Sequence, residues 1–374
     1  MAQKIRVMVV DDSMLFRTWL IKSLQEDPRF EVVGFAINAL DAKSKLPVLK
    51  PDIMTMDIEM PGMTGLQFLK EVLPVHPVPI ILVSSLNVQV FDALAAGAVD
   101  FVRKPESEPG ARDRFILTLR SKPAIGKNAH PRLPSHDPAA MYNKAKTASI
   151  GSTISSNGGI GLQHTASAAP AGIRKPVLAA PVNSNIDVIA IGASTGGTEA
   201  ILEVVRHFPA KMPGIVITQH MPAGFTSMYA ERLNRICNLE VKEAKHGDKI
   251  RPGLVLLAPG GLQMRVVRMG SGYAVSCSDG EKVSGHKPSV DVLFDSVAST
   301  VRNRAIGVIL TGMGADGAAG MLRMRKAGAY TIGQDRDSCV VYGMPMEAFK
   351  IGAVCMQSPL SSIHHAVMGR LSKG

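Results

Sequence analysis

The stretch NIDVIAIGASTGGTEAILEVVRHFP, residues 185–209, reads as a buried strand, a glycine-rich turn and an amphipathic helix. Its apolar run 186–191 is rich in β-branched residues and has the length of a strand buried on both faces. The glycines around Ser194 predict a sharp turn into a helix that starts near Thr198, because glycine adopts the backbone conformations that such turns require. A strand, a turn and a helix in this order predict an α/β domain.

Ser194 lies at a position that suits a nucleophile. A serine on a strand-to-helix turn projects its hydroxyl at the sheet edge, near free N–H groups and the positive end of the helix dipole. Nucleophilic attack and oxyanion stabilisation both need this environment. GASTG fits the G-x-S-x-G pattern, but the match is weak in a chain with 35 glycines. Phosphate binding by the turn is the competing interpretation.

Two later strands end in residues that could complete a hydrolytic site. GIVITQHMP (214–222) brings His220 to the end of a strand, and RNRAIGVILTGMGADG (302–317) brings Asp316 to the end of another. The carboxyl ends of parallel strands share one edge, so a base and its orienting carboxylate would meet Ser194 there. The chain order Ser, His, Asp is not that of the chymotrypsin, subtilisin or α/β-hydrolase groups. An ordinary lipase-type hydrolase is therefore disfavoured.

Each member of this set also has a simpler explanation. His220 alone would be a structural histidine, Ser194 a turn residue, and Asp316 the N-cap of a helix at 318–327. Their conjunction at one edge favours a hydrolase. We expect Asp316 to be more exposed than the carboxylate of a chymotrypsin-type triad.

The first third of the chain alternates short apolar runs with stretches of helical spacing, which predicts a second parallel sheet. The runs are KIRVMVV (4–10), PDIMTMD (51–57) and PIILVSS (79–85). Each ends on or before a polar residue, so the same edge collects Asp11, Asp12, Asp57 and Ser84. Crowded carboxylates repel one another unless a cation joins them.

A Mg²⁺ site accounts for three carboxylates at one edge, because Mg²⁺ prefers carboxylate, water and phosphate oxygens. Lys104, in FVRKP after another strand-like run, supplies a positive charge there. Taken singly, the aspartates could cap a helix, Ser84 could start a turn and Lys104 could be solvated. Together, in the order DD, D, S, K-P, they predict a phosphorylatable switch.

Residues 1–120 resemble the response-regulator receiver domain on these motifs, which implies a flavodoxin-like fold. The resemblance implies phosphorylation at Asp57 and a bound Mg²⁺. The implied roles are Asp12 and Asp57 as Mg²⁺ ligands with the backbone carbonyl of Glu59 and with Asp11 assisting, Ser84 and Lys104 as phosphoryl contacts, and Phe101 as the aromatic switch.

Residues 184–374 resemble the catalytic domain of CheB-type chemoreceptor methylesterases. The motifs GASTGG, QHMP, HGD, HKPSVDVLF and LTGMGADG occur in that order, and segments after residue 246 suggest a small β-ribbon beside a doubly wound parallel sheet. The resemblance implies Ser194 as nucleophile, His220 as general base and then acid, and Asp316 as orienting carboxylate. It also implies that Thr195 and the backbone N–H of Met313 bind the oxyanion.

The resemblance implies hydrolysis of glutamate methyl esters, and deamidation of glutamines, on chemotaxis receptors. A CheA-type histidine kinase would phosphorylate Asp57 and switch the enzyme on. The esterase chemistry would need no cofactor.

Between the two domains, residues 121–183 are rich in Ala, Ser, Gly and Pro and show no periodicity. Such a segment buries too little apolar surface to offset its ordering entropy, which predicts a flexible linker. It holds seven basic residues and one acid, out of a net charge of +11 for the whole chain. A solvated linker is favoured over one that binds an acidic partner or DNA.

Two other functions remain alternatives. A receiver-controlled DNA-binding protein would need a basic recognition helix, and the helices after Thr198 and Ala318 are too apolar and too mixed in charge for that role. A nucleotide-binding protein that uses GASTGG would need the lysine of a P-loop or the third glycine of a dinucleotide site, and this segment has neither. We therefore expect no nucleic-acid partner.

Composition predicts a cytoplasmic globular protein that does not insert into membranes. Apolar residues make up 46% of the chain and charged residues 20%, and no apolar run approaches the roughly 20 residues that span a bilayer. The four cysteines contain no C-x-x-C pair, which argues against a zinc site and against a disulfide framework.

Overall fold

The computed structural model describes residues 3–85, 89–105, 110–122 and 185–372. They form two α/β domains. The predicted linker at 121–183 lies almost wholly outside the described residues, so its boundaries stay a prediction. Within the described ranges, no helix combines the length and apolar character that crossing a bilayer would require.

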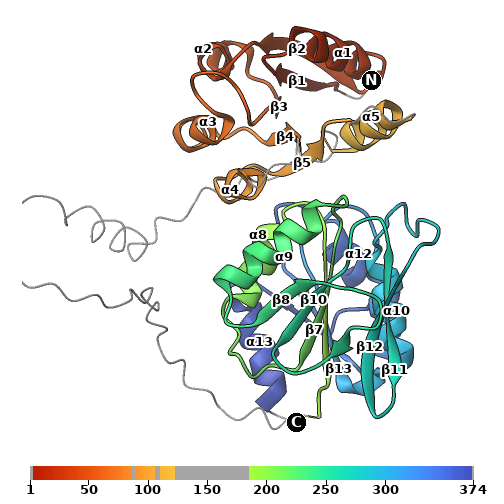
Figure 1. Ribbon diagram of the computed structural model, residues 1–374. Helices are drawn as coiled ribbons and strands as arrows, with labels where there is room; N and C mark the ends of the chain where they lie inside the picture. The colour runs from red at the N-terminus through yellow and green to blue at the C-terminus, as the bar shows by residue number, and fades with distance from the viewer. Residues whose placement is uncertain (1–2, 86–88, 106–109, 123–184, 373–374) are drawn as a thin grey trace, which may run out of the picture. The chain divides into compact units, whose positions relative to one another are not determined.

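The N-terminal domain is a five-stranded parallel sheet with helices between the strands (Figure 1). Its strands are β1 (Ile5–Val10), β2 (Phe30–Ala36), β3 (Ile53–Met56), β4 (Ile80–Ser84) and β5 (Asp100–Arg103). Its helices are α1 (Met14–Gln25), α2 (Ala39–Leu49), α3 (Gly65–Val72), α4 (Gln89–Ala95) and α5 (Ala111–Ser121). The strand order β2-β1-β3-β4-β5 is the flavodoxin-like order, as predicted.

Local sequence fixes how β1 passes into α1. The Ser13 side chain caps α1 by accepting a hydrogen bond from the Phe16 N–H, which satisfies one free donor of the first turn. Register then aligns the strand ends, because Val10 of β1 is paired with Met56 of β3. Asp11 and Asp57, the residues that follow, therefore leave the sheet side by side.

The C-terminal domain contains a seven-stranded parallel sheet and a three-stranded antiparallel sheet. Its strands are β6 (Val188–Ala193), β7 (Gly214–Gln219), β8 (Glu240–Glu243), β9 (Lys249–Ile250), β10 (Leu254–Leu257), β11 (Gln263–Met269), β12 (Gly272–Ser278), β13 (Ala305–Ile309), β14 (Tyr330–Gln334) and β15 (Met356–Ser358). Its helices are α8 (Gly197–Val205), α9 (Phe225–Ile236), α10 (Val290–Thr300), the 3₁₀ turn Arg302–Arg304, α11 (Ala318–Lys326), α12 (Met344–Lys350) and α13 (Leu360–Ser372).

The large sheet has the order β15-β14-β13-β6-β7-β10-β8. From β6 in the middle of the sheet, the chain adds β7, passes to the edge strand β8, inserts β10 between β7 and β8, and then returns to add β13, β14 and β15 on the other side of β6. The strand order thus reverses between β6 and β13, and ligands of doubly wound sheets bind at such a switch point. The small sheet of β11, β12 and β9 contains the predicted β-ribbon.

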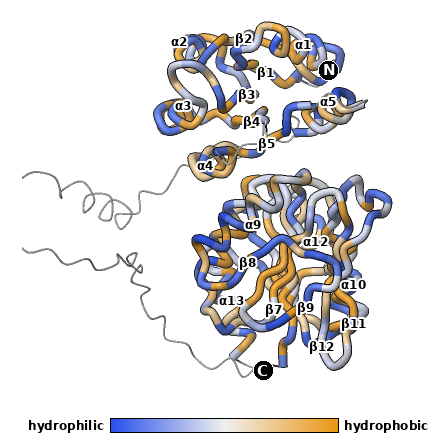
Figure 2. Tube along the Cα trace, in the orientation of Figure 1, coloured by the Kyte–Doolittle hydropathy of each residue, from blue (hydrophilic) through white to orange (hydrophobic). Residues whose placement is uncertain are grey.

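Side chains on the two faces of the large sheet pack into different layers, and hydrophobic residues follow its strands in Figure 2. Val188 and Ala190 of β6 belong to a buried cluster with Phe294 of α10 and with Met264 of β11. Ile189, between them in sequence, faces the opposite layer, since successive strand side chains alternate. Helices on both faces explain why these strands read as continuous apolar runs.

Candidate active site and acidic pocket

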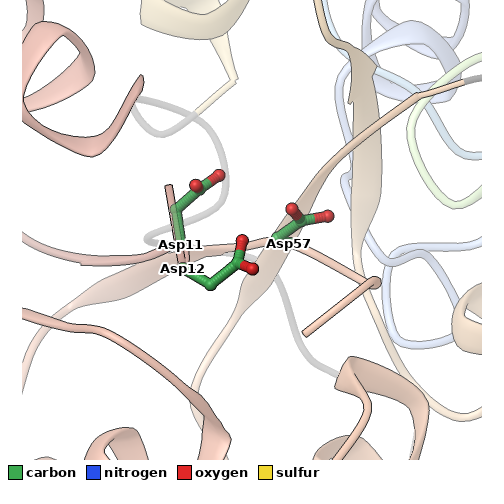
Figure 3. Close-up of side chains that lie close together, drawn as sticks. All are labelled: Asp11, Asp12 and Asp57. Atoms are coloured by element: carbon green, nitrogen blue, oxygen red, sulfur yellow. The ribbon is translucent and has the colours of Figure 1, made fainter. Parts of the chain in front are cut away.

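Three aspartates gather at the carboxyl end of the N-terminal sheet (Figure 3). Asp11 and Asp12 follow β1, and Asp57 follows β3. One carboxylate oxygen of each lies within 4.8 Å of the corresponding oxygens of the other two, with Asp11 and Asp57 buried and Asp12 exposed. This convergence was predicted from the strand ends, and the spacing suits one shared cation.

Lys104 neutralises part of this negative charge. Its Nζ lies 2.5 Å from Asp57 Oδ2 and 3.0 Å from Asp11 Oδ2. Burial raises the pKa of Asp57 above its ordinary value, and the hydrogen bond and charge of Lys104 only partly oppose that rise. Burial lowers the pKa of Lys104, but its hydrogen bond to Asp57 and the two carboxylate charges outweigh burial and leave that pKa raised. The lysine therefore stays charged beside the acids.

The other residues predicted for the phosphorylation site, Ser84, Glu59 and Phe101, belong to β4, to the segment after β3 and to β5. Ser84 ends β4, and its buried Oγ has no hydrogen-bond partner within the described part of the chain. The backbone N–H of Glu59 donates to Asp57 Oδ1 over 3.2 Å. Phe101 lies in β5, paired in register with Leu82 of β4. A buried hydroxyl without a partner beside three acids is a ready contact for a group that the chain itself does not supply.

In the C-terminal domain, Ser194 occupies the turn between β6 and α8. Its N–H donates to the Thr311 carbonyl over 3.0 Å, which ties the turn to the segment after β13. Gly196 caps α8 with φ +75°, a conformation that side chains rarely adopt. Gly312 passes so close that a Cβ there would lie 2.7 Å from Ser194 Cβ. The two glycines let the turn at Ser194 pack against the loop that follows β13.

His220 connects Ser194 to Asp316. Its Nδ1 lies 3.0 Å from Ser194 Oγ, and its Nε2 lies 2.7 Å from Asp316 Oδ2. Nε2 therefore donates to the carboxylate, and Nδ1 is the nitrogen that can accept the serine proton. The ring is turned the opposite way from the chymotrypsin-type triad, in which Nε2 faces the serine. The structure thus brings together the three residues that the sequence singled out.

Asp316 is held by the first turn of α10, an arrangement that sequence reasoning missed. Ser289 Oγ donates to Oδ1 over 2.8 Å, the Val290 N–H to Oδ2 over 2.7 Å and the Asp291 N–H to Oδ1 over 3.0 Å. Free N–H groups and the helix dipole make a helix N-terminus a good site for an anion. Ser289 is itself a signal for the start of a helix, but nothing in the sequence linked this cap to Asp316.

One expectation for Asp316 is wrong, and the simpler alternative role for it, as a helix cap, is not observed. Asp316 is buried, with 2% of its surface exposed, because α10 covers it, whereas we expected partial exposure. It also does not cap α11, whose N-cap is Gly317 at φ +89° without any side-chain cap. Its carboxylate points instead to α10 and His220.

Burial alone would raise the pKa of Asp316. The hydrogen bond and charge of His220 and the N–H groups of Asp291 and Val290 outweigh burial and lower that pKa to about 2. Asp316 is therefore ionised throughout the neutral range and can stabilise a positive charge on His220.

His286, from the HKPSVDVLF motif, covers one face of the His220 imidazole. The two rings stack with centroids 3.6 Å apart and planes 10° apart. Burial and the charge of His220 lower the pKa of His286 to about 4. His286 is therefore neutral when His220 takes up a proton. The motif named this residue, but no pattern in it predicted the stacking.

The predicted oxyanion residues flank the serine. Thr195 follows it, and the Thr195 carbonyl accepts from the Thr311 hydroxyl over 3.0 Å. Met313 lies in the loop after β13, and its N–H has no partner among the residues that the structure describes. A free N–H in this loop is available to a developing negative charge.

Comparison with known proteins agrees with both domains. The model of the family "CheB methylesterase" matches residues 189–367, and that of the "Response regulator receiver domain" matches residues 7–114. A protein-glutamate methylesterase/protein-glutamine glutaminase 2 from Syntrophomonas wolfei is 46% identical over 98% of this chain and 97% of its own length. The chain belongs to the CheB methylesterase family. The predicted pairing of a receiver with a methylesterase domain is thereby confirmed.

Other proteins similar to this CheB-family chain include a protein-glutamate methylesterase/protein-glutamine glutaminase from Syntrophotalea carbinolica, 45% identical over 100% of this chain and 99% of that protein. Among solved structures, the Thermotoga maritima CheB methylesterase catalytic domain is 32% identical and covers 49% of this chain and 98% of that chain, with a TM-score of 0.48.

Proposed function

We propose that this chain is a phosphorylation-controlled hydrolase that demethylates glutamate methyl esters, and deamidates glutamines, on chemotaxis receptors in the cytoplasm. The observation that carries the proposal is the continuous chain from Ser194 Oγ through His220 to Asp316, with distances of 3.0 and 2.7 Å. The curated relatives, named for both activities, supply the substrate class.

The geometry suits acyl transfer. Ser194 Oγ attacks the ester carbonyl while His220 Nδ1 takes its proton, and ionised Asp316 stabilises the resulting imidazolium. The carbonyl oxygen becomes an oxyanion that Thr195 and the Met313 N–H bind. His220 then protonates the leaving methanol, or ammonia in deamidation, and an acyl-enzyme forms on Ser194. Water, deprotonated by His220, releases the receptor glutamate and restores the serine.

Phosphorylation at Asp57 is the proposed control, with a CheA-type histidine kinase as donor. Asp12, Asp57 and the Glu59 carbonyl would hold Mg²⁺, with Asp11 assisting, and the three close carboxylates support this fit. Such a cation would neutralise charge on a phosphoryl group. Ser84, whose buried hydroxyl has no partner among the described residues, and Lys104, which is ion-paired with Asp57, would contact that group, and Phe101 of β5 would act as the aromatic switch.

Replacing the nucleophile tests the hydrolase. In the full-length Ser194→Ala variant, methanol release from methylated receptor membranes should vanish and labelling by a fluorophosphonate should be lost. Labelling of Asp57 by acetyl phosphate should persist, because the two chemistries occur in separate domains. Methanol release by the pure variant would contradict the nucleophile assignment.

Control by phosphorylation is tested separately. Acetyl phosphate should raise methanol release by the wild-type chain but not by the Asp57→Asn variant. An equal response of the two proteins would show that Asp57 does not control the esterase.

A further inference from the structure

Three buried glutamines of the C-terminal domain form hydrogen bonds close to Ser194, His220 and Asp316. Residues 185–372 contain four glutamines, and Gln219, Gln263 and Gln334 expose only 3%, 1% and 0% of their surfaces. A buried amide costs free energy unless its donors and acceptor are paired. Gln219 and Gln334 bond to the backbone of segments that carry a residue of the proposed triad or oxyanion site, and Gln263 bonds to the segment that carries His286 and Ser289, which contact that triad.

Gln219 joins the nucleophile to the base. It is the last residue of β7, and its Nε2 donates to the Ser194 carbonyl over 2.9 Å and to the His220 carbonyl over 3.2 Å. Its Oε1 has no hydrogen-bond partner within the described ranges. A Cβ at Gly197 would lie 2.1 Å from that oxygen, so only glycine fits there. The amide of Gln219 therefore acts through its N–H groups, which link the backbone of Ser194 to the backbone of His220.

Gln263 holds the segment that supports Asp316. Its Oε1 accepts from the Ser289 N–H over 2.9 Å, and its Nε2 donates to the His286 carbonyl over 3.2 Å. Ser289 in turn donates its hydroxyl to Asp316, and His286 stacks on the catalytic imidazole. One side chain therefore fixes both supports of the proposed triad.

Gln334 holds the loop that carries Met313. Its Oε1 accepts from the Thr311 N–H over 2.8 Å, and its Nε2 donates to the Ser338 carbonyl over 2.7 Å. The Thr311 carbonyl accepts from the Ser194 N–H, so the same loop is bound to the nucleophile turn. Displacement of Thr311 would move Ser194 and Met313 relative to each other.

We propose that Gln219, Gln263 and Gln334 are positioning residues of the hydrolase, each fixing one loop of the site through its amide. The inference rests on the proposed function of Ser194, His220 and Asp316. Glutamine suits this role because its neutral amide can bond to backbone groups that water would otherwise solvate: Gln263 and Gln334 use both the donor and the acceptor, and Gln219 uses the donor alone. A displacement of about 1 Å in a reacting group can cost about 10²-fold in rate.

The test replaces each amide by an apolar side chain of similar length in the full-length protein. The variants are Gln219→Met, Gln263→Met and Gln334→Met, with Gln357→Met as the matched control. Gln357 is half-buried in β15, and its amide donates to the Tyr342 hydroxyl rather than to a loop of the proposed triad. Measurements are the rate of Ser194 labelling by a fluorophosphonate, kcat and KM for methanol release, and the thermal unfolding midpoint.

Each folded variant should lose about 10- to 100-fold in labelling rate and in kcat, while KM stays within about twofold, because loops and not substrate contacts are altered. The control should match the wild type. A second readout uses Gln219→Glu, whose protonated acid can donate to one carbonyl whereas its carboxylate cannot. Its labelling rate relative to wild type should rise as the pH falls, and that of Gln219→Met should not.

Folded variants of all three glutamines that label within twofold of wild type would overturn the inference. Failure of all three to fold would also overturn it, because the amides would then serve the stability of the whole domain. A wild-type protein that is not labelled at Ser194 would instead overturn the proposed function.

Discussion

Replacing Asp316 by asparagine should disable the hydrolase and destabilise the domain together. Four groups donate to this carboxylate, namely the Ser289 hydroxyl, the Val290 and Asp291 N–H groups and His220 Nε2. An amide nitrogen in place of Oδ1 would face Ser289 and Asp291, and in place of Oδ2 it would face Val290 and His220. Either orientation of Asp316→Asn sets donor against donor in a buried site.

The expected stability loss is worked from burial and pKa. A buried donor left unpaired costs about 1–3 kcal/mol. Lowering the pKa of Asp316 from 3.8 to about 2 corresponds to stabilisation on the order of 2 kcal/mol by the ionised form. We expect the free energy of unfolding to fall by about 2–4 kcal/mol near pH 7. The folded pKa lies below the unfolded one, so the advantage of wild type is present above about pH 4 and shrinks as the pH falls toward 2.

The expected loss of turnover is about 10⁴-fold, the effect of the same change in a chymotrypsin-type triad, because Asp316 is buried and its carboxylate fixes the imidazole tautomer. Methanol release and urea unfolding between pH 3 and 8 measure the two effects. Asp295→Asn is the matched control, since Asp295 lies in the same helix α10 and its carboxylate forms an exposed ion pair with Arg323. A turnover within tenfold of wild type, or an unchanged free energy of unfolding, would refute this reasoning.

Three other perturbations follow from named contacts. Gly312→Ala places a Cβ 2.7 Å from Ser194 Cβ and 2.3 Å from Met344 Sδ, so fluorophosphonate labelling of Ser194 should fall at least about tenfold, and wild-type labelling would contradict this packing. The pKa of His286 is lowered to about 4, so as the pH falls below 6.5 the unfolded state takes up a proton at this residue before the folded state does. The free energy of unfolding of His286→Phe should therefore depend less on pH between 6.5 and 4 than that of the wild type. An equal pH dependence of the two proteins would argue against a neutral His286. Lys104→Met removes the ammonium group that pairs with the buried carboxylates of Asp11 and Asp57, and the free energy of unfolding should fall by about 1–3 kcal/mol. MgCl₂, but not NaCl of equal ionic strength, should restore part of this loss. A variant whose stability does not respond to Mg²⁺ would count against the cation site.

The sequence predicted the parts of the fold and of the sites that depend on strand ends. Asp57 and His220 each follow a continuous apolar run, and parallel strands bring such positions to one edge whatever the loops do. The contacts that hold the site were not predictable in this way. Gln263 reaches Ser289 from the start of strand β11, and His286 stacks on a ring that is 66 positions away in sequence.

Asp316 shows why local signals can mislead. A capping residue just before the helix at 318 was a reasonable interpretation of its position in sequence. In the structure, Gly317 adopts φ +89° and turns the chain, so the Asp316 side chain reaches α10 instead. Whether a carboxylate serves its own helix or another one depends on packing between elements, which no periodicity encodes.

The position of β6 in the large sheet has a consequence for synthesis of the chain. Ser194 and His220 leave the ribosome with one half of the sheet, whereas β13 and Asp316 belong to the half that is made last. Until β13 is added, β6 is an open edge, and the imidazole beside it has no carboxylate to orient it. A nascent or truncated chain that stops before β13 therefore holds the serine and the histidine without the carboxylate, and the proposed hydrolysis would begin only when the two halves of the sheet have joined.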